Sequence, residues 1–335
     1  MKRSVVPLLI IGLSACHSAS DPKADTPPPR RVDDPVPGGV GETLMMPAWE
    51  EMIQHTRISA PGKAMQPSAS RDGKRFVYAS TETSSNSQIF LRATDGVTPT
   101  RLTNNNATNL FPRLSPDGSR VAFASDISGN WDIYILRVDA PATWMQVTSS
   151  PCDDIGPSWS PDGQRLVYGS KTAAGFWQLV IVDIATGIPT FLGPGMNPDW
   201  SPHPKKDEQW IAFQSQPRGA EKCSLWIVRP DGSDLQEIVA DRHKDWSAIQ
   251  PRWSTDGAWI AYATVRRSIE SKTYGEEGEA DDIWIVRPDG RFDTRLTDEI
   301  AAEWWPAWGG DRLFFASRRD GFQNIYSVRP KPLDE

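Results

Sequence analysis

Six copies of one sequence unit predict an all-β protein, a six-bladed β-propeller of four-stranded blades. Each copy opens on a proline, and successive prolines lie 45, 45, 41, 53 and 55 residues apart. This period accommodates four short strands, the content of one blade. The composition agrees, because 29 Pro and 25 Gly among 335 residues suit short strands joined by tight turns. The opening prolines are Pro67, Pro112, Pro157, Pro198, Pro251 and Pro306.

A tight turn joins the first two strands of each unit. In Ser115-Pro116-Asp117-Gly118 the proline presets φ, the aspartate hydrogen-bonds nearby backbone, and the glycine accepts a left-handed conformation. The next strand, Val121-Ala122-Phe123, has the β-branched and aromatic residues of a buried strand. Four units keep Asp-Gly after the serine, whereas the fourth and sixth units have Ser201-Pro202-His203-Pro204 and Gly309-Gly310-Asp311.

A third strand has an aliphatic–aromatic–aliphatic signature in most units, as in Ile133-Tyr134-Ile135 and Ile283-Trp284-Ile285. A polar turn such as Asp231-Gly232 then leads to a fourth strand that ends in Arg101-Leu102-Thr103 or a similar sequence. The sixth unit has no fourth strand of its own. The segment Thr56-Arg57-Ile58-Ser59 resembles the end of a fourth strand, so we expect this N-terminal segment to pair with the last blade and close the ring.

This pattern, over about residues 56–329, resembles the WD40-like Pro-Asp repeat of TolB-type propellers. The resemblance implies a periplasmic envelope protein with a binding role, and a partner such as a peptidoglycan-associated lipoprotein. TolB-type proteins also carry an α/β domain before the propeller. The sequence has only a proline-rich segment there, so we expect a lipoprotein propeller without that domain.

The N-terminus predicts a lipid anchor. Lys2 and Arg3 precede a short apolar run, and Leu13-Ser14-Ala15-Cys16 resembles the bacterial lipobox, in which the cysteine becomes lipid-modified. We therefore expect a signal peptide over 1–16, a disordered tether over 17–43, and the propeller over 44–335. The residue after the cysteine is His17 and not the aspartate that signals inner-membrane retention, which favours the outer membrane, with the protein facing the periplasm.

Composition and motifs disfavour several functions. The net charge of −7 without a basic stripe argues against nucleic acid. The chain has no Gly-x-Ser-x-Gly nucleophile elbow, and its four histidines lack zinc-site spacing, so we expect no enzyme, no cofactor and no metal. The acidic insertion Arg266 to Asp282 does not match a calcium loop, and a solvated loop is favoured over a cation site. Cys152 and Cys223 permit a disulfide in an oxidising compartment, although buried thiols are slightly preferred.

Propeller topology places the loops between blades and the loops between second and third strands on one face. Carboxylates and off-register tryptophans gather there, a composition suited to a protein partner. The first hypothesis is therefore a protein-binding scaffold, and the second is a carbohydrate or peptide receptor at the channel mouth. A hydrolase-related propeller is a much weaker third. The candidate residues are Asp126, Trp131, Asp153, Asp154, Asp245, Trp246, Asp281, Glu303 and Trp305.

Overall fold

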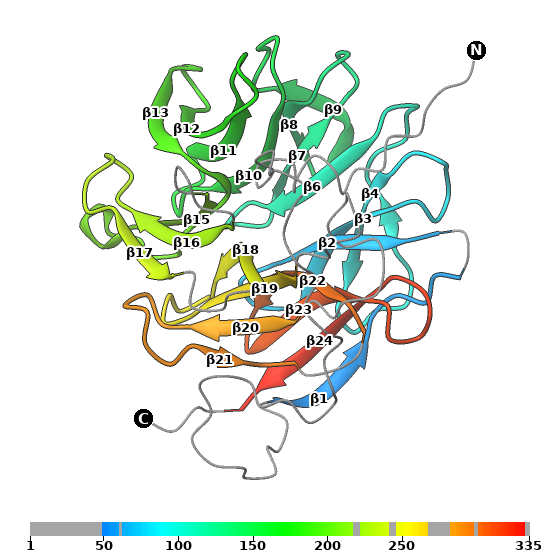
Figure 1. The fold of residues 1–335 in the computed structure, drawn as a ribbon. Coiled ribbons are helices and arrows are strands. Elements are labelled where there is room, and N and C mark those ends of the chain that lie inside the picture. The colour runs from blue at the N-terminus through cyan, green and yellow to red at the C-terminus, as the bar shows by residue number, and fades with distance from the viewer. Residues whose placement is uncertain are drawn as a thin grey trace, which may run out of the picture.

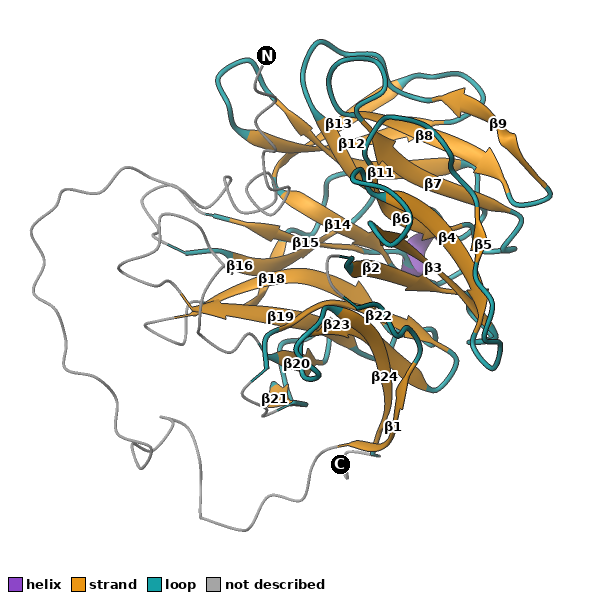
Figure 2. Ribbon diagram, turned by 90° about the vertical axis from the view of Figure 1, so that its right-hand side faces the viewer, coloured by secondary structure: helices purple, strands orange, loops and turns teal. Residues whose placement is uncertain are grey.

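A computed structural model describes residues 49–59, 62–216, 222–240, 246–266, 282–297 and 301–331. Its strands form six four-stranded antiparallel sheets arranged around a central axis (Figure 1). The one helical element of the described ranges is a 3-10 turn, η2 (Lys206–Glu208), which Figure 2 shows in purple with the blades seen from the side. This confirms the predicted six-bladed propeller.

The blades are numbered 1 to 6 along the chain, and their strands are lettered a to d from the axis outward. Blade 1 contains β2 (Ala64–Ala69), β3 (Arg75–Ser80), β4 (Gln88–Ala93) and β5 (Thr100–Arg101). Blade 2 contains β6 (Asn109–Leu114), β7 (Arg120–Ser125), β8 (Asp132–Arg137) and β9 (Ala140–Gln146). Blade 3 contains β10 (Asp154–Trp159), β11 (Arg165–Lys171), β12 (Trp177–Asp183) and β13 (Pro189–Pro194).

The remaining blades follow the same order. Blade 4 contains β14 (Met196–Trp200), β15 (Ile211–Ser215), β16 (Ser224–Val228) and β17 (Gln236–Val239). Blade 5 contains β18 (Trp246–Trp253), β19 (Ile260–Arg266), β20 (Ile283–Val286) and β21 (Thr294–Arg295). Blade 6 contains β22 (Glu303–Gly309), β23 (Arg312–Ser317) and β24 (Asn324–Pro330), and its outer strand is β1 (Trp49–Gln54).

The ring is closed by an N-terminal strand, as expected, but the strand lies earlier than the sequence predicted. β1 pairs with β24, and the predicted segment 56–59 follows β1. The Thr56 hydroxyl accepts the Ile325 N–H at 2.8 Å, just as Thr103 accepts the Ile89 N–H at 2.9 Å. Thr56 therefore occupies the place of Thr103, three residues from the predicted alignment. The mismatch arises because buried His55 occupies the position that Leu102 has in blade 1.

Side chains of the a and b strands hold neighbouring blades together. Trp159, Trp200 and Trp253 are buried at one repeat position, which confirms their predicted packing role. The Arg120 guanidinium lies 4.6 Å from the Trp159 ring, and Arg165 lies 4.8 Å from the Trp200 ring. These cation–π contacts each join one blade to the next.

Two smaller points follow from the described residues. Cys152 is a free thiol and does not pair with Cys223, whose side chain is buried. No helix in the described ranges has the length and apolar character needed to cross a membrane.

Candidate functional site

The inner strands of the six blades line a central channel, and one repeat position faces it in each blade. This is the residue directly after each opening proline. In blades 1, 3 and 6 the residue is small, whereas blades 2, 4 and 5 place a charged side chain in the channel. The six residues are Ser68, Arg113, Ser158, Asp199, Arg252 and Ala307.

A β-bulge precedes each of these residues. The residue before the proline has a positive φ in every blade, from 51° at Asn197 to 57° at Gln250 in the five non-glycine cases and 64° at Gly156. Such a conformation costs on the order of 1–3 kcal/mol in a non-glycine residue. Contacts to the next blade offset this cost: Gln66 Oε1 accepts the Phe111 N–H at 2.7 Å, and Gln250 Oε1 accepts the Trp305 N–H at 2.9 Å.

Side chains in the channel satisfy the free edges of the inner strands. Ser158 Oγ accepts the Trp200 N–H at 3.0 Å and donates to Asp199 Oδ1 at 3.1 Å. Asp199 Oδ2 then accepts the Trp253 N–H at 2.8 Å. Both oxygens of this carboxylate are therefore engaged in joining blades 3, 4 and 5.

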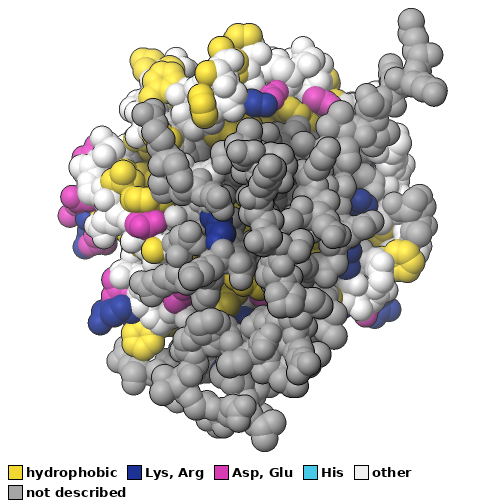
Figure 3. Space-filling model, viewed as in Figure 1, with side chains coloured by type: hydrophobic (Ala, Val, Ile, Leu, Met, Phe, Trp, Pro, Cys, Tyr) yellow, Lys and Arg dark blue, Asp and Glu magenta, His cyan; other side chains and the backbone are white. Residues whose placement is uncertain are grey.

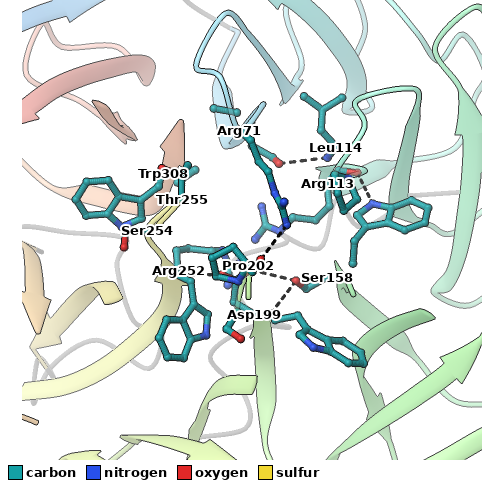
Figure 4. A pocket seen from close by; sticks show the side chains of 18 of the residues that line it. Arg71, Arg113, Leu114, Ser158, Asp199, Pro202, Arg252, Ser254, Thr255 and Trp308 are labelled. Carbon is teal, nitrogen blue, oxygen red and sulfur yellow. Dashed lines mark hydrogen bonds between the residues drawn. The ribbon is translucent and has the colours of Figure 1, made fainter. Parts of the chain in front are cut away.

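At one end of the channel lies a cavity of about 130 Å³, lined by residues from all six blades (Figure 4). Its walls are the last residues of the a strands and the turns that lead to the b strands. Arg113 and Arg252 enter from opposite sides and point toward its middle, with Asp199 beside them (Figure 4). Burial, together with the nearby Arg252, lowers the pKa of Arg113 to about 9, which leaves the guanidinium charged at neutral pH.

None of the candidate residues from the sequence lines this cavity. Those that the structure describes belong to the opposite end of the a strands, where the b–c loops and the connections between blades lie. Asp126 and Asp153 are half-buried there: Asp126 Oδ1 accepts the Thr108 N–H at 2.7 Å, and Asp153 pairs with Lys171 at 3.8 Å. Asp245, Asp281 and Cys16 lie outside the described residues, as do the predicted tether and residues 267–281 of the acidic insertion.

Asp154 and Glu303 are buried at the starts of the inner strands of blades 3 and 6. Ser150 Oγ donates to Asp154 Oδ2 at 3.3 Å, and Glu303 forms an ion pair with Arg319. Burial, with the charge of Asp132 as a smaller cause, raises the pKa of Asp154. Neither carboxylate is therefore exposed on the surface, contrary to the expectation.

Two of the three candidate tryptophans are also core residues, contrary to the expectation of exposed loop positions. Trp131 is 9% and Trp305 is 8% exposed, and Trp305 lies within β22 against Trp304 at 6.1 Å. Trp246 is half-buried as the first residue of β18. The repeat explains Trp131, because buried Trp177 and Gln323 hold the same position two residues after a glycine.

Three exposed apolar side chains on the same face were missed by the sequence reasoning. Ile127, Phe176 and Phe322 lie in the b–c loops of blades 2, 3 and 6 and are 51%, 72% and 40% exposed. Phe176 and Phe322 share a detectable signal, since each directly follows the glycine of its loop. In Figure 3 hydrophobic side chains gather at the top of the view, over the blade that contains β12 and β13. We use the name loop surface for five residues of this face that are exposed or half-buried: Asp126, Ile127, Asp153, Phe176 and Phe322.

The geometry agrees with what comparison with known families finds. A family model described as the TolB beta propeller domain matches residues 52–216. The chain carries a TolB-type β-propeller. An uncharacterised protein of Agrobacterium fabrum is 36% identical over 74 residues, a segment that covers 21% of this chain and 23% of that relative. The match thus spans less than a quarter of the relative's length.

Solved structures share the TolB-type propeller fold. A putative TolB from Agrobacterium tumefaciens has a TM-score of 0.62 at 23% identity, covering 82% of this chain and 92% of that one. TolB from Acinetobacter baumannii has a TM-score of 0.55 at 16% identity, covering 79% and 65%. An oligogalacturonate lyase from Vibrio parahaemolyticus has a TM-score of 0.55 at 14% identity, covering 84% and 94%. At these identities the likeness concerns the fold alone, and the fold is found in binding proteins and enzymes alike.

Proposed function

We propose that this chain is a protein-binding scaffold of the bacterial cell envelope, anchored by a lipid at Cys16 in the outer membrane and facing the periplasm. The observation that carries the binding role is the exposure of Ile127, Phe176 and Phe322 on one face of the propeller. Apolar side chains exposed on one face offer a protein partner apolar surface to bury. A peptidoglycan-associated lipoprotein is the partner that the TolB-type repeat favours.

The second candidate, a receptor for a saccharide at the channel mouth, has less support. The cavity of about 130 Å³ is smaller than the roughly 300–1,000 Å³ of pockets that enclose drug-sized ligands. We propose no catalytic step, because the chain has no nucleophile elbow. Within the described residues, moreover, no three His, Cys, Asp or Glu side chains are placed to share a metal ion.

Crosslinking in whole cells, followed by purification of the full chain, tests the scaffold. We expect a stoichiometric envelope protein that is captured by the native chain and lost from Phe176→Ser. The matched control is Val97→Ser, because Val97 is 84% exposed but lies in the c–d turn of blade 1, on the other face. Equal capture by both variants contradicts a role for the loop surface.

The lipid anchor has a separate test. Replacing the lipobox cysteine, Cys16→Ser, removes the thiol that accepts the lipid. We expect the variant to leave the membrane fraction while its near-ultraviolet circular dichroism matches that of the native protein. A variant that stays in the membrane fraction contradicts lipid anchoring.

A further inference from the structure

Two arginines face one another across the channel at the cavity. Arg113 comes from blade 2 and Arg252 from blade 5, and blades three apart in a ring of six lie on opposite sides of the axis. Their side chains are 8% and 5% exposed. Small residues at the same position in three other blades show that the fold does not need a long charged side chain there.

These guanidinium groups leave most of their hydrogen-bonding capacity unused. Arg113 Nη1 reaches the Pro67 and Pro112 carbonyls only at 3.4 Å, and Arg252 Nη1 donates to the Pro251 carbonyl at 2.6 Å. Both Nε atoms are buried without a partner within the described structure. A guanidinium offers five N–H donors, so several on each arginine remain available to a ligand.

The charges at the cavity do not balance. Asp199 is the acidic side chain among the described lining residues, and its oxygens already accept bonds from Ser158 and Trp253. No ion pair joins Asp199 to either arginine in the described structure, although its charge lies close enough to interact with both. Two guanidinium groups and one carboxylate leave a net positive charge in a poorly solvated space, which is costly unless an anion enters.

A third arginine lies at the opening. Arg71 reaches from the a–b turn of blade 1 toward blade 4, where its Nη2 donates to the Pro202 carbonyl at 3.4 Å (Figure 4). This bond is long and the Arg71 side chain is exposed, so the contact is weak. Arg71 adds positive charge where a ligand enters and attracts anions toward the cavity.

We propose that this cavity binds one compact oxyanion, a carboxylate or phosphate group, held between Arg113 and Arg252 and approached past Arg71. The planar fork of a guanidinium matches the oxygen pairs of both groups. The volume of about 130 Å³ admits a small anion but not an oligosaccharide. This site is independent of the proposed scaffold, since the loop surface lies at the other end of the inner strands.

Thermal unfolding of the full chain tests the proposal, with sodium acetate and sodium phosphate as separate probes and sodium chloride at equal ionic strength as the reference. We expect at least one oxyanion to raise Tm by about 3 °C when its concentration is ten times its dissociation constant. Acetate and phosphate titrations compared by calorimetry then identify which group the site prefers. The proposal fails if neither probe raises Tm above the chloride reference.

Substitutions of the arginines show whether the rise in Tm comes from binding in this cavity. Arg113→Gln and Arg252→Gln should lose the rise in Tm while their Tm without oxyanion stays at or above that of the native chain, because a buried unbalanced charge has been removed. Arg137→Gln is the matched control, since Arg137 is exposed and pairs with Asp139 far from the lining residues. Arg113→Lys keeps the charge but not the fork, and we expect about tenfold weaker binding. Native affinity in Arg113→Gln or Arg113→Lys overturns the assignment.

Discussion

Protonation of His55 should destabilise the closed ring at acidic pH. His55 follows β1 directly and is 2% exposed, with its ring 5.3 Å from Phe76 of blade 1 and 5.0 Å from Phe314 of blade 6. Its Nε2 is hydrogen-bonded to Ser327 Oγ at 2.8 Å. Burial, with the nearby charges of Arg92 and Arg312, lowers the pKa of His55 from 6.5 to about 4. The imidazole is therefore neutral in the folded ring at neutral pH.

The pKa difference sets the size of the effect. A lowered pKa in the folded state means that the unfolded chain binds the proton more tightly, so stability is present above pH 6.5 and is lost as pH falls toward about 4. From these two pKa values, the free energy of unfolding falls by about 2 kcal/mol between pH 7 and pH 5, and by about 3 kcal/mol at pH 4.

Urea unfolding followed by tryptophan fluorescence at pH 7, 6 and 5 measures this loss. The comparison variant is His55→Gln, which cannot take up the proton and shares all other titrating groups with the native chain. The native chain should lose about 2 kcal/mol more than His55→Gln over this range. Parallel pH profiles for the two proteins would refute the argument, whatever their difference in stability at pH 7.

Three further predictions concern buried contacts of the propeller. Thr148→Val should lower the free energy of unfolding in urea by about 1–3 kcal/mol. The reason is that Thr148 Oγ1 accepts the buried Ile133 N–H at 2.9 Å and donates to Asp132 at 3.1 Å. The control Thr190→Val, at an exposed position, should change stability little. Asp154→Asn should gain stability relative to the native chain as pH rises above 3.8, since the raised folded pKa makes the carboxylate unfavourable; equal pH profiles would contradict this. Gly309→Ser should lower the free energy of unfolding by about 1–3 kcal/mol, although the other five units have serine at this position, because a Cβ at 309 overlaps Ala69 Cβ. Adding Ala69→Gly should restore part of this loss, as measured by thermal unfolding.

The repeat made most of the architecture predictable, and its limits lie at particular residues. Counting the units predicted six blades and the inter-blade tryptophans. The alignment of the closing strand failed because His55 fills a position that reads as aliphatic in blade 1. The exposure predicted for Trp305 was wrong because simple alternation along a strand does not account for the bulge, which buries the residue before the proline in five of the six blades. The same bulge explains why the channel arginines were not predicted, because a single sequence does not show which residues of a bulged strand face the axis.

The closing strand also decides how the ring responds to mechanical load. Trp49 at the start of β1 lies opposite Pro330 near the end of β24, so the two ends of the described propeller meet at one end of the seam. Tension between the two chain ends therefore acts across the hydrogen bonds of this strand pair in succession and peels it open like a zipper. Tension applied along the full length of the strands would load those bonds together. With the C-terminal end held, a pull on the N-terminal side of residue 49 therefore separates β1 from β24 in the weaker of these two loading directions.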